Sequence, residues 1–320
     1  MAKFKKMLLF VLGAIFVSFL LAYITAAWNE RPLDDDARAK APGVFLNTSQ
    51  GKIHYQWYGK KGAPVIVMAH GLATPSFTFR QNADALAAVG FRVLTFDHLG
   101  RGWSDRPKAR YDALFYEREL LDVLNGLALK EPVGLVGISM GGLTMSNFAG
   151  RYPDRVKALF LFVPVGFDLA SDPDSIFRKM LMTPVVGDWI WRVFGKKFVL
   201  SNPQYDDSKL EPINQLQGDM AEQMSYQGYF QALLSTVRHL PLRNRNDVYQ
   251  KLHATDIPVT ALFGSDDTTV LPSSLDKLNK IIPRANGVMI QGGGHGLNYQ
   301  MSIRSNEHLT TFFRSHLKTE

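Results

Sequence analysis

The chain has 320 residues, of which 46% are hydrophobic and 20% are charged, and this composition is typical of a globular protein with a sizeable core. It contains no cysteine, which excludes disulfides, thiolate zinc sites and cysteine nucleophiles. The net charge of +7 includes Lys3, Lys5 and Lys6, and no run of five or more basic residues occurs. We therefore relate the positive charge to a membrane and expect no binding of nucleic acid.

The first predicted element is an apolar helix near the N-terminus. Residues 7–28 carry no charged side chain, and about 20 apolar residues are enough to span a bilayer as a helix. The lysines before this stretch favour a cytoplasmic N-terminus, although basic residues from Arg31 onward weaken that bias. We expect residues 1–28 to be an uncleaved, single-pass anchor with the catalytic domain on the non-cytoplasmic (periplasmic or extracellular) side. A cleaved signal peptide that ends at the small residues 25–27 is the alternative.

A polar linker is predicted over residues 29–44, and strand-like and helix-like segments alternate beyond it. Most of the strand-like runs are apolar throughout, as is typical of parallel strands that are covered on both faces. Their alternation with helices predicts a doubly wound α/β fold. The expected strands are 53–58, 64–69, 91–96, 133–138, 158–163, 259–263 and 288–290, and the expected helices among them are 77–88, 111–127 and 140–152.

The alternation stops at about Pro164 and resumes at about Pro258. The segment 164–257 between them is helix-like and rich in aromatic residues. An insertion of this length within an α/β pattern is typical of a lid over the C-terminal edge of the sheet. We therefore expect a core formed by residues 45–163 and 258–320, with a helical lid inserted between its two parts.

The strongest chemical motif is a G-x-S-x-G sequence centred on Ser139, between an apolar strand and a helix. A sharp turn at this point lifts one side chain clear of the sheet, and it requires small residues such as Gly137 and Gly141 on both sides. Ser139 is the candidate nucleophile. The N–H of Met140 lies at the start of the helix, where it can donate to a developing oxyanion.

A second motif, His70-Gly71, stands at the end of the strand 64–69. Gly71 allows the following loop to approach the nucleophile closely. The N–H of Leu72 is then the natural second donor of an oxyanion hole. We expect His70 itself to be structural.

A serine hydroxyl needs a base to become a nucleophile at neutral pH. Among the eight histidines, His295 alone stands in a glycine-rich loop after a short apolar run, so it is the candidate base. Its imidazole needs an anionic partner to fix the tautomer. Asp266 and Asp267 both follow an apolar strand, and the residues alone leave the choice between them open.

Together these motifs resemble the α/β-hydrolase superfamily over about residues 45–318, and residues 97–104 add a D-x-x-G-x-G-x-S loop similar to one of that family. The resemblance implies a mostly parallel eight-stranded sheet with helices on both faces and the chain order serine, aspartate, histidine. It also implies no cofactor and no metal. The family's acid lies three residues after the glycine of a G-x-x-D pattern, so Gly264 selects Asp267 over Asp266.

The same resemblance implies a serine hydrolase that cleaves carboxylic esters through an acyl-enzyme. The predicted anchor and apolar lid are similar to those of monoacylglycerol-lipase-like members, and they favour an apolar or lipid-derived small-molecule ester as substrate. Two alternatives stay open: a carbon–carbon bond hydrolase of ring-cleavage products, and a catalytically inert, membrane-tethered binding protein. The first of these usually has asparagine where this chain has Ile138.

Overall fold

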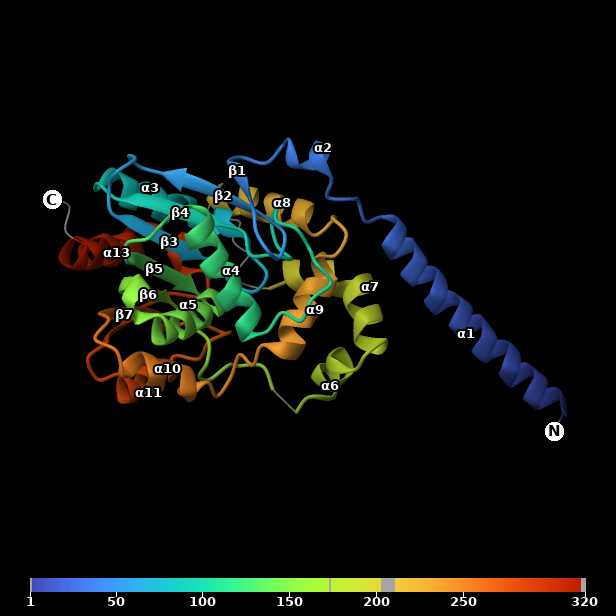
Figure 1. Cartoon of the computed structure of the whole chain (residues 1–320). Helices are drawn as coiled ribbons and strands as arrows, with labels where there is room; N and C mark the ends of the chain where they lie inside the picture. Colours follow the sequence, from blue (N-terminus) through green and yellow to red (C-terminus); the bar gives the residue numbers. More distant parts are fainter. Residues whose placement is uncertain (1, 173, 203–210, 318–320) are drawn as a thin grey trace.

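The structure, a computed structural model, describes residues 2–172, 174–202 and 211–317 (Figure 1). They form an α/β body from which the long N-terminal helix α1 (Ala2–Trp28) projects. The lid helices lie between the sheet and α1, whereas the last helix, α13 (Ser302–His316), lies on the far side of the body (Figure 1).

An eight-stranded sheet forms the centre of the body, in the order β1-β2-β4-β3-β5-β6-β7-β8. The pairs β1–β2 and β2–β4 are antiparallel, and every other neighbouring pair is parallel. The expectation of a mostly parallel eight-stranded sheet is therefore confirmed. The strands are β1 (Val44–Asn47), β2 (Lys52–Tyr58), β3 (Val65–Ala69), β4 (Arg92–Phe96), β5 (Val133–Ile138), β6 (Val156–Phe162), β7 (Val259–Gly264) and β8 (Asn286–Ile290).

Helices cover both faces of this sheet, so the central strands are apolar throughout. All six residues of β5 are buried, and burying one large aliphatic or aromatic side chain contributes about 1.5–3 kcal/mol. One face packs against α3 (Arg80–Ala88) and α13, and the other packs against α4 (Ala113–Gly126), α5 (Met140–Arg151), α10 (Asn246–His253) and α11 (Ser274–Ile281). The short helix α12 (Leu297–Gln300) follows β8.

The edge of the core differs in detail from the expected elements. The range 29–44 contains a short helix, α2 (Asp35–Arg38), which Asp34 caps by accepting a hydrogen bond from the Ala37 N–H at 2.9 Å. Strand β1 begins at the end of that range and pairs only with β2. Its four residues are too short to show a periodic pattern.

Among the described residues, four helices follow β6 and form the lid: α6 (Ile176–Met182), α7 (Val186–Leu200), α8 (Glu211–Gln223) and α9 (Tyr229–His239). Helices α7, α8 and α9 share a small apolar cluster of their own, which includes Val199, Met220 and Leu233. Helix α10 falls within the range expected for the lid, but it packs against α5 beside the sheet. The division into domains stays a prediction.

Helix α1 is long and apolar enough to cross a bilayer, since an 18-residue window within Lys3–Trp28 has a mean hydropathy of 2.7. A signal sequence near the N-terminus can have the same length and composition. Helix α1 touches the lid through α7. The Trp189 indole stacks on the Phe19 ring at 4.5 Å, and its N–H donates to the Phe19 carbonyl at 2.9 Å. Just beyond α1, the Arg192 guanidinium is paired with the Glu30 carboxylate at 3.0 Å.

Candidate active site

Ser139 occupies the sharp turn between β5 and α5. Its φ of 54° and ψ of −116° lie in a region that residues other than glycine rarely adopt. The neighbouring glycines are sterically required, because a Cβ on Gly137 would lie 2.4 Å from the Gly141 carbonyl oxygen. A Cβ on Gly141 would lie 2.1 Å from the carbonyl oxygen of Ala69 in β3. The turn thus presents the Ser139 hydroxyl at the C-terminal edge of the sheet.

The structure brings Ser139, His295 and Asp267 together in one chain of hydrogen bonds. The Ser139 hydroxyl lies 3.0 Å from His295 Nε2, and His295 Nδ1 lies 2.9 Å from Asp267 Oδ2. The other carboxylate oxygen of Asp267 accepts the N–H groups of Thr269 at 2.7 Å and Val270 at 2.9 Å. With Nδ1–H donating to Asp267, Nε2 is left to accept the serine proton.

Asp266, the competing carboxylate, is exposed and lies away from this chain. Its Oδ1 accepts a hydrogen bond from the Ser265 hydroxyl at 2.6 Å. Its backbone N–H donates to the Gly293 carbonyl at 2.9 Å, which ties the turn after β7 to the loop that carries His295. Asp266 therefore helps to hold that loop through its backbone, while Asp267 contacts the imidazole.

The loop after β3 approaches Ser139 closely. A Cβ on Gly71 would lie 3.4 Å from the Ser139 Cβ, and Leu72 lines the same cavity as Ser139. Two buried donors hold the carbonyls of this loop: His70 Nδ1 bonds to the Gly71 oxygen at 2.8 Å, and Arg101 Nε donates to the Leu72 oxygen at 2.7 Å. Fixing these carbonyls also fixes the direction of the Leu72 N–H.

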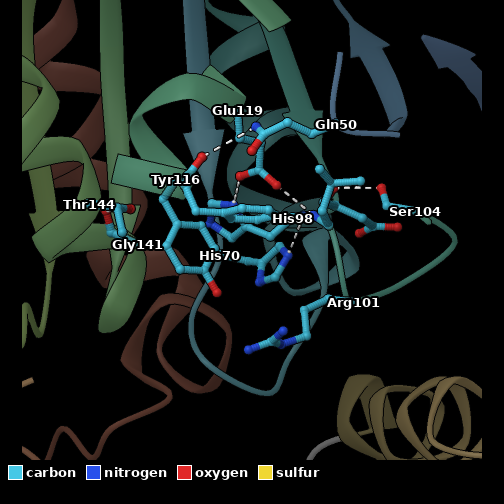
Figure 2. Close-up of polar contacts among 12 residues, drawn as sticks. Gln50, His70, His98, Arg101, Ser104, Tyr116, Glu119, Gly141 and Thr144 are labelled. Atoms are coloured by element: carbon cyan, nitrogen blue, oxygen red, sulfur yellow. Dashed lines mark hydrogen bonds and ion pairs between the residues drawn. The ribbon is translucent and has the colours of Figure 1, made fainter. Parts of the chain in front are cut away.

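A buried polar network supports the loop after β3, and Figure 2 shows it. The His98 N–H donates to His70 Nε2 at 2.9 Å, so the proton of His70 sits on Nδ1 and points to the loop. The imidazole of His98 is hydrogen-bonded to Glu119, whose other oxygen accepts the Leu99 N–H at 2.5 Å. Burial raises the pKa of Glu119 well above its usual value, and burial lowers the pKa of His98 to about 3.

Asp97 organises the loop after β4. Its carboxylate accepts the N–H groups of Ser76 at 2.8 Å and Trp103 at 2.9 Å, and it bonds to His54 Nδ1 at 2.8 Å. Although burial acts to raise the pKa of Asp97, the His54 charge and these hydrogen bonds bring it far below its usual value. A Cβ on Gly102 would lie 2.0 Å from an Asp97 oxygen, which explains the glycine of the D-x-x-G-x-G-x-S motif.

Sequence reasoning missed Arg101, which lies within that same motif. It is a fully buried arginine, and besides Leu72 it donates to the Thr236 hydroxyl of lid helix α9 at 2.8 Å. It therefore links the loop after β3 to the lid. An arginine between two glycines looks like an exposed turn residue, so its sequence context gave no signal of this role.

A cavity of about 320 Å³ lies between Ser139 and the lid. Its walls are mainly apolar, and they combine residues of the sheet edge with residues of α7 and α9. Within the described part of the chain, no group of three or more histidine, cysteine, aspartate or glutamate residues could hold a metal ion. The apolar lining includes Leu72, Ile138, Val165, Leu169, Trp191, Phe198, Val199, Leu233, Val237, Leu240 and Leu242.

An elbow serine at the C-terminal edge of a parallel sheet, in contact with an imidazole and a carboxylate from later loops, defines an α/β-hydrolase-like protein. A family model described as alpha/beta hydrolase fold matches residues 64–300. The chain therefore belongs to the alpha/beta hydrolase fold family.

Relatives and solved structures agree with this family. The chain is 23% identical to a carboxylesterase of Bacillus subtilis over 87% of this chain and 90% of that protein. It is 26% identical to a non-heme chloroperoxidase of Kitasatospora aureofaciens over 77% of this chain and 89% of the relative. The crystal structure of an enol-lactonase from Burkholderia xenovorans aligns with a TM-score of 0.70 at 20% identity, covering 84% of this chain and 99% of the other. At that identity, the structural likeness shows the fold alone.

Proposed function

We propose that this chain is a serine hydrolase that cleaves carboxylic esters through an acyl-enzyme intermediate. The observation that carries the proposal is the hydrogen-bonded chain from Ser139 through His295 to Asp267, with distances of 3.0 and 2.9 Å. A family whose members include a carboxylesterase and a lipase supports the ester as substrate class.

The geometry supports a two-step reaction. His295 Nε2 takes the proton of Ser139 as the serine oxygen attacks the ester carbonyl, and Asp267 stabilises the imidazolium that forms. The N–H groups of Leu72 and Met140 stabilise the oxyanion, and His295 returns the proton to the leaving alcohol. Water activated by His295 then attacks the acyl-enzyme, which releases the carboxylic acid and restores Ser139.

The proposed oxyanion donors have their amides free for a ligand. No hydrogen bond from the N–H of Leu72 or Met140 is found within the part of the chain that the structure describes. Buried backbone N–H groups are almost always paired, so an unpaired N–H on buried Met140, with a second on half-buried Leu72 across Ser139, favours an incoming acceptor. A carbonyl oxygen of the substrate satisfies that need.

We further propose that α1 anchors the chain in a membrane as a single span, with the catalytic domain on the non-cytoplasmic side. The apolar length of α1 and the lysines in its first turns support this topology. Resistance of the full chain to alkaline carbonate extraction tests the anchor. N-terminal sequencing of the mature protein tests the cleaved signal peptide, and protease accessibility in sealed vesicles tests the side.

A fluorophosphonate probe tests the nucleophile directly. We expect the probe to label the wild type and to fail on Ser139→Ala, whereas Ser201→Ala, an exposed serine outside the cavity, is labelled as the wild type is. Folding of each variant is checked by circular dichroism. A folded wild type that is not labelled favours the inert binding protein. Labelling together with turnover of a vinylogous diketone and little esterase activity favours the carbon–carbon bond hydrolase.

A further inference from the structure

The cavity above Ser139 has mainly apolar walls, but two arginine side chains give part of its lining a positive charge. Arg178 of α6 and Arg243 of the segment before α10 both line it. Among the residues that the structure describes, no aspartate or glutamate lines this cavity. Apart from the His295 imidazole, the two guanidinium groups are its only basic lining groups in the described chain.

Arg243 is partly satisfied by the protein. Its Nη1 donates to the Leu169 carbonyl at 3.0 Å, and its Nη2 donates to the Ser171 hydroxyl at 2.7 Å and to the Ser171 carbonyl. Its Nε is buried and has no partner within the described residues. Arg243 is therefore held in place by backbone groups at the cavity wall, with donor capacity remaining.

Arg178 brings a second positive charge close to the first. Burial and the nearby charge of Arg178 lower the pKa of Arg243. Arg178 has no ion pair within the described chain, whereas its neighbour Lys179 pairs with Asp174 at 3.6 Å. Two guanidinium groups that line one cavity repel each other, and an anion between them would turn this repulsion into attraction to the anion.

Among the residues that the structure describes, the nearby carboxylates do not fill this role. Asp168 and Asp172 lie outside the cavity lining, and their charges only partly oppose the lowering of the Arg243 pKa. Asp168 is already bonded to Lys277 at 2.6 Å and to the Ser273 hydroxyl at 2.9 Å. Within the described part of the chain, the side of the guanidinium pair that faces the cavity is left for a ligand.

We propose that the substrate is an ester that carries an anionic oxygen group, a carboxylate or a phosphate, at the end of its chain remote from the scissile carbonyl. Arg178 binds this group, because a guanidinium pairs with an oxyanion through two parallel hydrogen bonds, and Arg243 adds its positive charge and the remaining Nη1 hydrogen. The apolar wall of Leu233 and Leu240 receives the methylene groups between the anion and the carbonyl. The inference rests on the proposed esterase function and narrows its substrate class from apolar esters to apolar esters with one charged end.

A matched set of substrates tests the proposal on the full chain in detergent. The neutral probe is 4-nitrophenyl hexanoate, and the charged probes are the 4-nitrophenyl hemiester of adipic acid and 4-nitrophenyl 6-phosphooxyhexanoate. We expect the wild type to have a kcat/KM at least tenfold higher on one charged probe than on the neutral one. The better of the two charged probes identifies the group as carboxylate or phosphate.

Single substitutions test which residues cause the preference for a charged ester. Arg178→Gln is expected to lower kcat/KM on the preferred charged ester at least tenfold more than on the neutral ester, mainly through KM. Arg243→Gln tests the second guanidinium, although it also releases the carbonyl of Leu169. Lys179→Gln, one residue along α6 and outside the cavity lining, is the matched control and leaves both substrates unchanged.

A binding measurement separates this inference from the proposed function. In the Ser139→Ala background, monomethyl adipate (or methyl 6-phosphooxyhexanoate) is titrated by calorimetry, and Arg178→Gln is expected to weaken its binding at least tenfold. A wild type that hydrolyses the neutral ester as well as the charged ones, or an Arg178→Gln variant that loses both equally, overturns the inference and leaves the esterase intact. Binding of the anionic ester without turnover or fluorophosphonate labelling overturns the proposed function instead.

Discussion

Replacing Asp267 by asparagine tests the proposed triad most sharply, because the two carboxylate oxygens have different partners. Oδ1 accepts two backbone N–H groups, from Thr269 and Val270, and Oδ2 faces His295 Nδ1. In Asp267→Asn the amide oxygen must keep the position of Oδ1, since an NH₂ group there would face two donors. The NH₂ group is then directed at His295, and Nδ1 becomes an acceptor.

This rearrangement places the imidazole proton on Nε2, the nitrogen that faces the Ser139 hydroxyl. An Nε2–H cannot accept the serine proton, so the dominant tautomer has no base for the nucleophile. A wrong tautomer of this kind lowers kcat by about 10⁴-fold in a serine protease, which corresponds to roughly 5 kcal/mol of barrier. We expect a loss of about 10³- to 10⁴-fold in kcat on 4-nitrophenyl butyrate, with little change in the melting temperature, because the asparagine is nearly isosteric.

The neighbouring carboxylate provides the control. In Asp266→Asn the amide oxygen can still accept the exposed hydrogen bond from the Ser265 hydroxyl, and only an exposed charge away from His295 is lost, so we expect kcat within about twofold of the wild type. Burst kinetics with the same ester separate slow acylation from slow deacylation. The reasoning is refuted if Asp267→Asn retains more than about a tenth of the wild-type kcat while folded, or if Asp266→Asn alone is inactive.

Three further changes probe the surroundings of the triad. Gly141→Ala places a Cβ 2.1 Å from the Ala69 carbonyl, so we expect a loss of about 3 kcal/mol or more of unfolding free energy, or no soluble fold, as measured by thermal melting. Arg101→Met releases the Leu72 carbonyl, and we expect kcat to fall about 10- to 100-fold with a smaller change in KM. Glu119→Gln keeps both hydrogen bonds of a protonated Glu119. The raised pKa of Glu119 makes the folded state hold a proton that the unfolded state releases above about pH 4.5, so wild-type stability falls as pH rises. We expect the melting temperature of the variant minus that of the wild type to increase from pH 5 to pH 8 by about 3 °C or more. A melting-temperature difference that does not change with pH would contradict a protonated Glu119.

The sheet and the elbow were predictable from sequence because their signals are local. An apolar run such as that of β5 is buried on both faces wherever it lies in a parallel sheet, and the tight turn around Ser139 demands glycine at fixed offsets. The glycine loop of His295 is local in the same sense. The choice of Asp267 rested on a family spacing, since adjacent carboxylates look equivalent until the Thr269 and Val270 amides hold one of them.

Features that depend on packing between distant segments left no such signal. Helix α10 continues a helical stretch in sequence, and only its contact with α5 places it beside the sheet. Arg178 and Arg243 belong to different elements, and they come together because the lid folds back over the sheet edge. The stacking of Trp189 on Phe19 likewise joins the lid to α1 across 170 residues of sequence.

Several unfavourable features of this fold gather around the loop after β3. Ser139 has a strained backbone, and within the described residues Arg101 Nη1 and His98 Nε2 are buried without hydrogen-bond partners. Each of these costs about 1–3 kcal/mol, and such costs persist where the surrounding structure over-determines the geometry. Here the surrounding structure consists of buried strands on one side and a polar network that ends on the carbonyls of Gly71 and Leu72 on the other. Because a network of this kind resists movement, the position of the Leu72 N–H is set before any substrate enters, which is what an oxyanion site requires.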